Sequence, residues 1–173
     1  MDELKAKIRT IPDWPEKGVM FRDITTLLKD AEAFQKTIDM LSQRYKNQDI
    51  DIIAGIESRG FIIGSALADR LGIGFIPIRK KGKLPSKVIS EEYKLEYGTA
   101  SIEMHEDAVK SGTKVLLIDD VIATGGTAVA ACQLIRRLKG SVVECGFIIG
   151  LPALGGMRKL EENGERIFTL MTY

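Results

Sequence analysis

Residues 115–127 read VLLIDDVIATGGT, and this stretch decides the fold. Its apolar part, Val115–Ile118, is hydrophobic on both faces and β-branched at both ends, which predicts a buried strand of a parallel sheet. Asp119 and Asp120 follow that strand. In open α/β sheets ligands bind beyond the carboxyl ends of the strands, so these two carboxylates are well placed to hold vicinal hydroxyl groups.

The glycine-rich turn after the two acids has the composition of an anion site. It consists of Ala123, Thr124, Gly125, Gly126 and Thr127. Glycine lets backbone N–H groups converge on one point, and a helix that begins near Thr127 would direct its positive end there. A capped turn with no ligand would leave the Gly-Gly pair between two threonines unexplained, so we predict a sugar-phosphate site. No lysine follows the glycines and the spacing is not G-x-G-x-x-G, so the turn is neither a Walker A loop nor a dinucleotide motif.

Strands and helices alternate along most of the chain. The predicted order is helix 31–46, strand 51–56, helix 60–71, strand 74–78, strand 114–118, helix 127–138 and strand 142–149. Such alternation predicts an α/β fold, with an open and mostly parallel sheet flanked by helices. Residues 2–10 also have helical spacing, which Pro12 ends. A length of 173 residues predicts one domain, residues 1–173.

A second loop, Glu57-Ser58-Arg59-Gly60, joins a predicted strand to a predicted helix. It falls at the same edge of the sheet as the first loop. An arginine at the start of a helix opposes the helix dipole, unless an anion lies between them. A surface arginine facing solvent is the plainer interpretation, and we favour a second anion site because of the position of the loop.

Residues 79–107 break the alternation, and we call them the lid. They begin with a basic run, 79–87, and continue with a polar segment over 93–104 that alternates like an antiparallel hairpin. A long excursion between core strands is either a functional element or a disordered insertion, and this alternation favours an ordered flap. The basic run taken alone would be interpreted as a solvated loop.

The composition excludes several classes of protein. The formal net charge is +1, with 28% charged residues, so nothing in the overall charge indicates a nucleic-acid or membrane partner. No apolar run approaches the length of a membrane span. Cys132 and Cys145 lack metal-ligand spacing, which favours core packing in a reducing compartment and predicts a cytoplasmic protein.

The stretch 115–127 is similar to the phosphoribosyl diphosphate (PRPP) signature of the type I phosphoribosyltransferases. Four more strings, in compatible order and spacing, resemble the members of this family that act on adenine. They are GVMFRDI at 18–24, ESRGF at 57–61, RKKGKLP at 79–85 and LEYG at 95–98. The resemblance covers nearly the whole chain and implies the fold of that family, with the lid and a small N-terminal hood, residues 1–30.

The resemblance implies transfer of the phosphoribosyl group of PRPP to adenine, giving AMP and pyrophosphate, in purine salvage. Mg²⁺ would enter with PRPP and without dedicated protein ligands, and the chain would form a homodimer. The resemblance also implies which residues bind each part of the substrates. The ribose would lie on Asp119 and Asp120, the 5′-phosphate on Ala123 to Thr127, the pyrophosphate on Ser58, Arg59 and Lys83, and adenine on Phe21, Arg22, Val121 and Leu151. The catalytic residues it implies are Glu96, for proton transfer, with Arg59 and Lys83.

One departure from the family pattern concerns the base pocket. Gly150 precedes Leu151 where relatives usually carry an acidic residue, and Gly155-Gly156-Met157 follows, so we expect a looser backbone there. Two alternatives remain open: a phosphoribosyltransferase for another base, and a PRPP-sensing regulator without turnover. A regulator needs a nucleic-acid-binding module, and the roughly twenty residues before Phe21 are too few for a winged helix.

Overall fold

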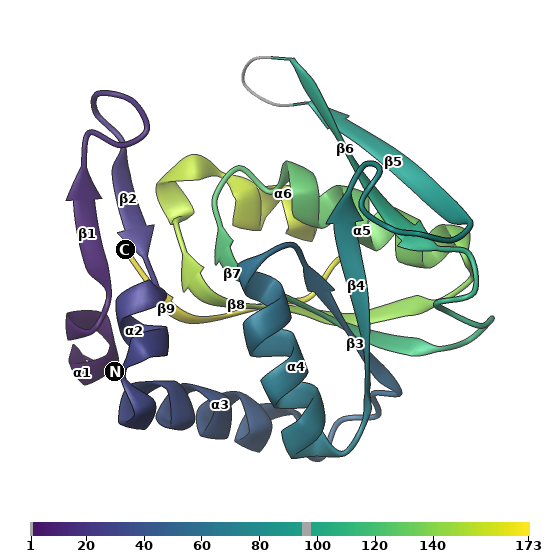
Figure 1. Cartoon of the computed structure of the whole chain (residues 1–173), viewed down its shortest axis with the longest axis horizontal. Helices are drawn as coiled ribbons and strands as arrows, with labels where there is room; N and C mark the ends of the chain where they lie inside the picture. Colours follow the sequence, from purple (N-terminus) through teal and green to yellow (C-terminus); the bar gives the residue numbers. More distant parts are fainter. Residues whose placement is uncertain (1, 95–97) are drawn as a thin grey trace.

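A seven-stranded sheet with the order β5-β6-β4-β3-β7-β8-β9 forms the centre of the computed structural model, which describes residues 2–94 and 98–173 (Figure 1). Its strands are β3 (Ile52–Ile56), β4 (Gly74–Lys80), β5 (Val88–Lys94), β6 (Thr99–His105), β7 (Lys114–Ile122), β8 (Ser141–Gly150) and β9 (Ile167–Thr172). Strands β4, β3, β7, β8 and β9 run parallel, which confirms the predicted α/β class. The hairpin β5–β6 joins them antiparallel, at the last two residues of β4.

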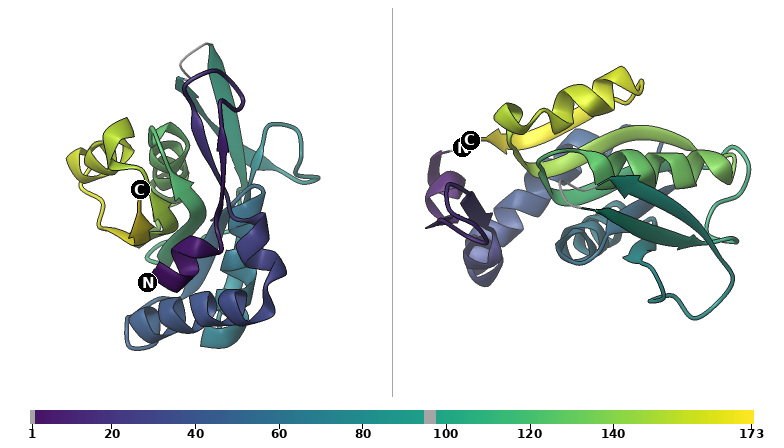
Figure 2. Two further views of the ribbon diagram at one scale, coloured as in Figure 1. Left: turned by 90° about the vertical axis from the view of Figure 1, so that its left-hand side faces the viewer. Right: turned by 90° about the horizontal axis from the view of Figure 1, so that it is seen from above.

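Helices cover both faces of the sheet (Figure 2). The helices are α1 (Asp2–Ala6), α2 (Thr25–Lys29), α3 (Ala31–Tyr45), α4 (Arg59–Leu71), α5 (Gly126–Arg137) and α6 (Gly156–Glu162), with a 3₁₀ turn at Pro152–Leu154. The hood, α3 and α4 bury one apolar cluster that includes Leu116 of β7. Helices α5 and α6 bury the other cluster, which includes Leu117. Successive residues of β7 therefore serve opposite cores, which is why this strand is apolar on both faces.

Local sequence explains where the main helices begin and end. Asp30 caps α3, because its side chain accepts a hydrogen bond from the Ala33 N–H at 3.1 Å. Gly72 ends α4 in the left-handed conformation, with φ of +69°. These two helices agree with the prediction, whereas β7 continues to Ile122 and so contains the two acids that were expected just beyond it.

The hood differs from the sequence prediction. The helix expected over residues 2–10 ends at Ala6, and Arg9–Pro12 forms β1 instead. Strand β1 pairs antiparallel with β2 (Met20–Asp23), and this pairing supplies the backbone hydrogen bonds that a longer helix would have made. The buried Ile8 serves the core in either conformation, so its spacing did not distinguish them.

The lid hairpin packs against α5. Arg137 of that helix donates to the Ser90 carbonyl oxygen at 2.5 Å and to the Glu91 carboxylate at 2.9 Å. At the other end of the helix, the Tyr93 ring lies beside Gly126. The lid is therefore an ordered flap over 88–94 and 99–105, as the alternation predicted, and it reaches the glycine-rich turn.

Both thiols lie inside the protein. Cys132 on α5 is 1% exposed and Cys145 on β8 is 0% exposed, with 3.5 Å between their sulfur atoms. The hydrogen bond with Cys145 and, after it, burial raise the pKa of Cys132. The two cysteines belong to the core, as their positions in the sequence predicted. In the described part of the chain, no helix is long and apolar enough to cross a membrane.

Candidate active site

A cavity of about 460 Å³ opens where the carboxyl ends of β3, β4 and β7 meet the hood and the lid. This is the edge at which ligands bind in open α/β sheets. The lining residues come from six parts of the chain. They are Met20, Phe21 and Arg22 of β2; Ile56 at the end of β3 with Glu57, Ser58 and Arg59 after it; Lys80 of β4; Tyr93 and Ile102 of the hairpin β5–β6; Asp119, Asp120, Val121, Ala123 and Thr127 of β7 and the turn into α5; and Leu151 after β8. Most of the predicted site residues therefore face one space.

The glycine-rich turn forms a smaller hollow beside this cavity. Thr124, Gly125 and Gly126 line the hollow, and it shares Ala123 and Thr127 with the larger one. Gly125 has φ of +78° and precedes α5, and no side chain of residues 2–94 or 98–173 caps that helix. The first N–H groups of α5 are consequently available to an anion at its positive end.

Asp119 and Asp120 lie side by side near the end of β7. Asp120 is 4% exposed and accepts a hydrogen bond from Nε of Arg59, whose side chain is 39% exposed. Burial and the neighbouring Asp120 raise the pKa of Asp119 well above its usual range. The two acids are thus held in different environments: Asp120 is paired with an arginine, whereas Asp119 lies buried beside a like charge.

The loop after β3 is packed tightly against these acids. At Gly60, a Cβ atom would lie 2.8 Å from the Ile118 carbonyl oxygen and 2.9 Å from Oδ1 of Asp119. Only glycine allows this approach, so Gly60 brings Ser58 and Arg59 up to the end of β7. The two loops that the sequence identified separately meet here.

Aromatic and cationic groups of the hood form the opposite wall. The Phe21 ring packs edge-on against Trp14, with 4.4 Å between ring centroids. The Arg22 guanidinium donates to Thr10 and lies 4.2 Å from the centre of the Tyr173 ring. Tyr173 in turn donates to the Lys5 carbonyl oxygen at 3.2 Å, so it is held against the hood by both Arg22 and Lys5. No pattern in the sequence singles out this tyrosine.

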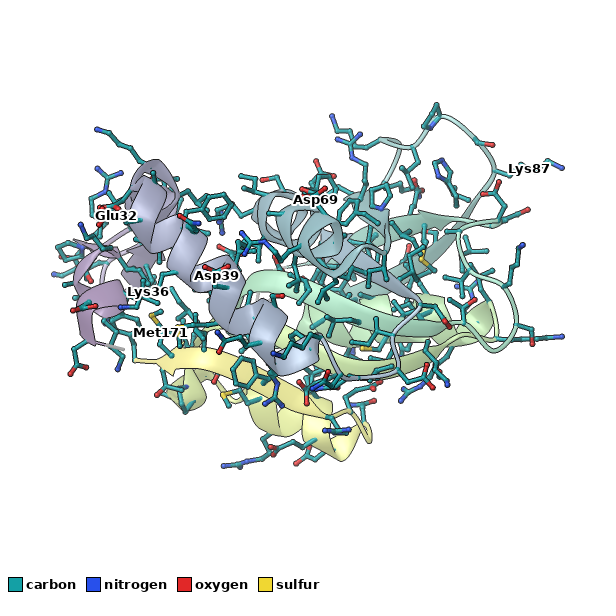
Figure 3. The ribbon with its side chains drawn as sticks, turned by 90° about the horizontal axis from the view of Figure 1, so that it is seen from below. Glu32, Lys36, Asp39, Asp69, Lys87 and Met171 are labelled. Atoms are coloured by element: carbon teal, nitrogen blue, oxygen red, sulfur yellow. The ribbon has the colours of Figure 1, made fainter. Side chains whose placement is uncertain are left out.

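The basic residues of the lid are placed differently from one another. Lys80 lines the cavity, whereas Lys83, the predicted pyrophosphate ligand, is not one of its lining residues. Lys87 points outward, away from the body of the molecule (Figure 3). Glu96 lies outside the described residues.

Gly150 and Gly156, near the end of β8, are tightly packed, contrary to the looser backbone expected there, whereas no atom lies within 4 Å of a Cβ atom built at Gly155. At Gly150, a Cβ atom would lie 2.8 Å from Thr169 and 3.1 Å from the Met157 sulfur. At Gly156, it would lie only 2.2 Å from the Ala123 carbonyl oxygen. The Gly156 N–H also donates to that oxygen at 2.9 Å, so Gly156 supports the glycine-rich turn from behind.

Comparisons with known proteins agree with this geometry. The model of the phosphoribosyl transferase domain family matches residues 23–163. An adenine phosphoribosyltransferase of Chlorobium phaeobacteroides (strain BS1) is 55% identical over 172 residues, which cover 98% of this chain and 97% of that protein. The enzyme of the same name from Methylobacillus flagellatus is 56% identical over 170 residues, with 98% and 97% covered.

Solved structures give the same result. The crystal structure of adenine phosphoribosyltransferase from Thermoanaerobacter pseudethanolicus has a TM-score of 0.96 and 48% identity, and 99% of each chain is covered. The Saccharomyces cerevisiae enzyme, solved with adenine and an imino-altritol bisphosphate, has a TM-score of 0.92 and 38% identity, with 98% of this chain and 97% of that chain covered. The fold and the match to the family model define the class of phosphoribosyltransferases. Within that class, the chain belongs to the adenine phosphoribosyltransferase family.

Proposed function

We propose that this chain transfers the phosphoribosyl group of PRPP to adenine, giving AMP and pyrophosphate, as an enzyme of purine salvage. The observation that carries the proposal is the shared cavity. Two acids at the end of β7, an uncapped helix N-terminus, an arginine loop and an aromatic wall all face it. Each of these features fits a different part of the two substrates.

On the PRPP side, Asp119 and Asp120 accept hydrogen bonds from the ribose 2′ and 3′ hydroxyls. The turn Ala123–Thr127 holds the 5′-phosphate with its backbone N–H groups. Ser58 and Arg59 hold the pyrophosphate, and Lys83 reaches it on movement of the lid. This assignment explains why Arg59 and Asp120 lie within contact of each other, since they hold adjoining parts of one molecule.

The chemistry is a displacement at the anomeric carbon, with inversion. The bond to pyrophosphate breaks ahead of the new bond to N9 of adenine, so positive charge develops on the ribose and negative charge on the leaving group. Arg59 and Lys83 neutralise the leaving group, and the carboxylates of Asp119 and Asp120 lie near the developing cation. Catalysis is therefore mainly electrostatic and positional.

The donor set of the cavity fits a metal that is bound mostly by its substrate. Among the described residues, the one cluster of three candidate metal ligands is Cys132, Cys145 and Glu165, and none of them lines the cavity. We expect Mg²⁺ to be held by the oxygens of PRPP, whose ribose would contact Asp119 and Asp120. Mg²⁺ prefers phosphate and water oxygens, and it supplies charge neutralisation on the diphosphate.

On the base side, Phe21 stacks on the purine and Arg22 contacts its edge. Val121 and Leu151 close the opposite side of the ring. Glu96 exchanges a proton with a ring nitrogen of adenine, a role that rests on the family resemblance alone. Glu96→Gln tests this role: turnover within a few-fold of the parent would exclude it, because general acid or base help is worth roughly 10² to 10⁴ in rate.

The family resemblance also supports three proposals about the whole chain. Residues 1–173 act as one domain with the hood, 1–30, and the lid, 79–107. The protein is a homodimer, which light scattering coupled to size-exclusion chromatography tests directly. It works in the cytoplasm, where PRPP is available.

The function is tested by pyrophosphate release with PRPP, Mg²⁺ and one base at a time. We expect turnover with adenine and little with hypoxanthine, guanine, xanthine or uracil. Turnover with one of the other bases instead would establish the first alternative. PRPP binding by calorimetry with no turnover on any base would establish the regulator.

A further inference from the structure

An acid lines the cavity at the place proposed for pyrophosphate. Glu57 directly precedes Ser58 and Arg59, and its side chain is 17% exposed. A carboxylate repels a polyanion, so its presence there needs a physical reason. Its contacts supply one, because they join two loops that the sequence treats as separate.

The Glu57 carboxylate links the end of β3 to the end of β4. It accepts from Nε and Nη2 of Arg79, each at 3.3 Å, and from the backbone N–H of Lys80 at 3.0 Å. Burial acts to raise the pKa of Glu57, but these donors outweigh it and lower the pKa below the usual value. Glu57 is therefore ionised at neutral pH, and its charge is already matched by cationic and N–H partners.

The chain of contacts continues into the basic run of the lid. Arg79 Nη1 donates to the Lys83 carbonyl oxygen at 2.9 Å. The N–H of Gly82 donates to the Glu103 carboxylate at 2.9 Å, and Glu103 is 6% exposed. The turn that carries both Lys80 and Lys83 is thus held from two sides, by Glu57 through Arg79 and by Glu103.

We propose that Glu57 is a positioning residue for the pyrophosphate half of the site: it fixes Lys80 through the backbone N–H, and Lys83 through Arg79, beside the Ser58–Arg59 loop. This inference rests on the proposed function. Lys80 lines the cavity, so its backbone position bears directly on this half of the site.

A positioning role for Glu57 and simple electrostatics predict opposite effects of one substitution on pyrophosphate affinity. Glu57→Gln removes one negative charge from an anion site, so charge alone predicts tighter pyrophosphate binding. If Glu57 positions the basic turn, the same change weakens binding. We expect the Kd of pyrophosphate, measured by calorimetry with Mg²⁺, to rise about tenfold. In kinetics, the KM for PRPP should rise by a similar factor, with the KM for adenine within twofold of the parent.

Two further variants separate positioning from a general loss of stability. Glu165→Gln is the matched control. Glu165 is also a buried glutamate paired with an arginine, Arg136 at 2.6 Å, but it does not line the cavity. The variant should therefore leave pyrophosphate binding unchanged. The double variant Glu57→Gln with Arg79→Gln should bind pyrophosphate less than twofold more weakly than Glu57→Gln alone, because both residues act through one contact.

Unchanged or tighter pyrophosphate binding by Glu57→Gln would overturn the inference, as would fully additive effects in the double variant. Calorimetry needs no turnover. An inactive parent that binds pyrophosphate would thus reject the proposed function while leaving this inference testable.

Discussion

Gly156→Ala should lower kcat/KM for PRPP, although Gly156 is not itself expected to contact PRPP. The new Cβ atom would lie 2.2 Å from the Ala123 carbonyl oxygen, 2.6 Å from the Gly125 nitrogen and 2.8 Å from the Thr124 carbonyl carbon. All three atoms are backbone of the proposed 5′-phosphate turn, so no side chain can rotate away. Relief requires a shift of about 1 Å, and a misplacement of that size costs on the order of 10²-fold in rate. Overpacking adds about 1–3 kcal/mol of lost stability.

The assay is steady-state kinetics with PRPP varied at saturating adenine, together with urea unfolding. We expect kcat/KM for PRPP to fall about a hundredfold while the variant stays folded. Gly155→Ala is the matched control, because no atom lies within 4 Å of its new Cβ. Its φ of +74° costs stability, about 1–2 kcal/mol, without pushing the turn. If Gly156→Ala kept kcat/KM within threefold of the parent, the turn would not depend on this contact.

Three other changes follow from the same contacts. Asp119→Asn combined with Asp120→Asn should lower kcat/KM for PRPP by 10²-fold or more, roughly, and unchanged PRPP affinity by calorimetry would refute the ribose assignment. Arg44→Met should lower the free energy of unfolding in urea by about 3 kcal/mol, because the Glu144 carboxylate, 1% exposed, loses two donors at 2.7 and 2.8 Å. A decrease under about 1 kcal/mol would contradict this. Burial alone would raise the pKa of Asp23, but hydrogen bonds from its neighbours lower it to about 2. The ionised Asp23 therefore contributes about 2 kcal/mol of stability above about pH 4, and this contribution is lost as the pH falls toward 2. In Asp23→Asn the free energy of unfolding should depend less on pH over that range.

The sequence predicted the parallel sheet and its main helices because their patterns are local. The buried strand before Asp119 and the helix that ends at Gly72 each carry their own apolar period or end residue. Strand β9 and helix α6 escaped prediction. Residues 167–172 are half-buried along much of the strand, and the short α6 begins in a Gly-Gly turn without a side-chain cap, so neither has a strong local pattern.

The position of the candidate site could be predicted from the sequence, whereas the contacts that support it could not. Asp119, Asp120 and Arg59 were expected at one edge of the sheet, and they lie together there. The role of Gly156 could not be predicted, because a close approach of two backbones far apart in sequence leaves only a glycine as its mark. Which lysine faces the cavity also depends on tertiary contacts, since Glu57 and Glu103 orient the turn.

The buried thiols have a practical consequence for following the lid. Alkylating reagents react with exposed thiolates, and neither Cys132 nor Cys145 offers one. Maleimide reagents should therefore leave the unmodified chain unlabelled, so its own cysteines need not be replaced first. A single cysteine introduced at the outward-pointing Lys87 would carry a fluorophore on the lid of an otherwise unaltered protein. Its fluorescence, recorded while substrates are added one by one, would test whether the lid moves.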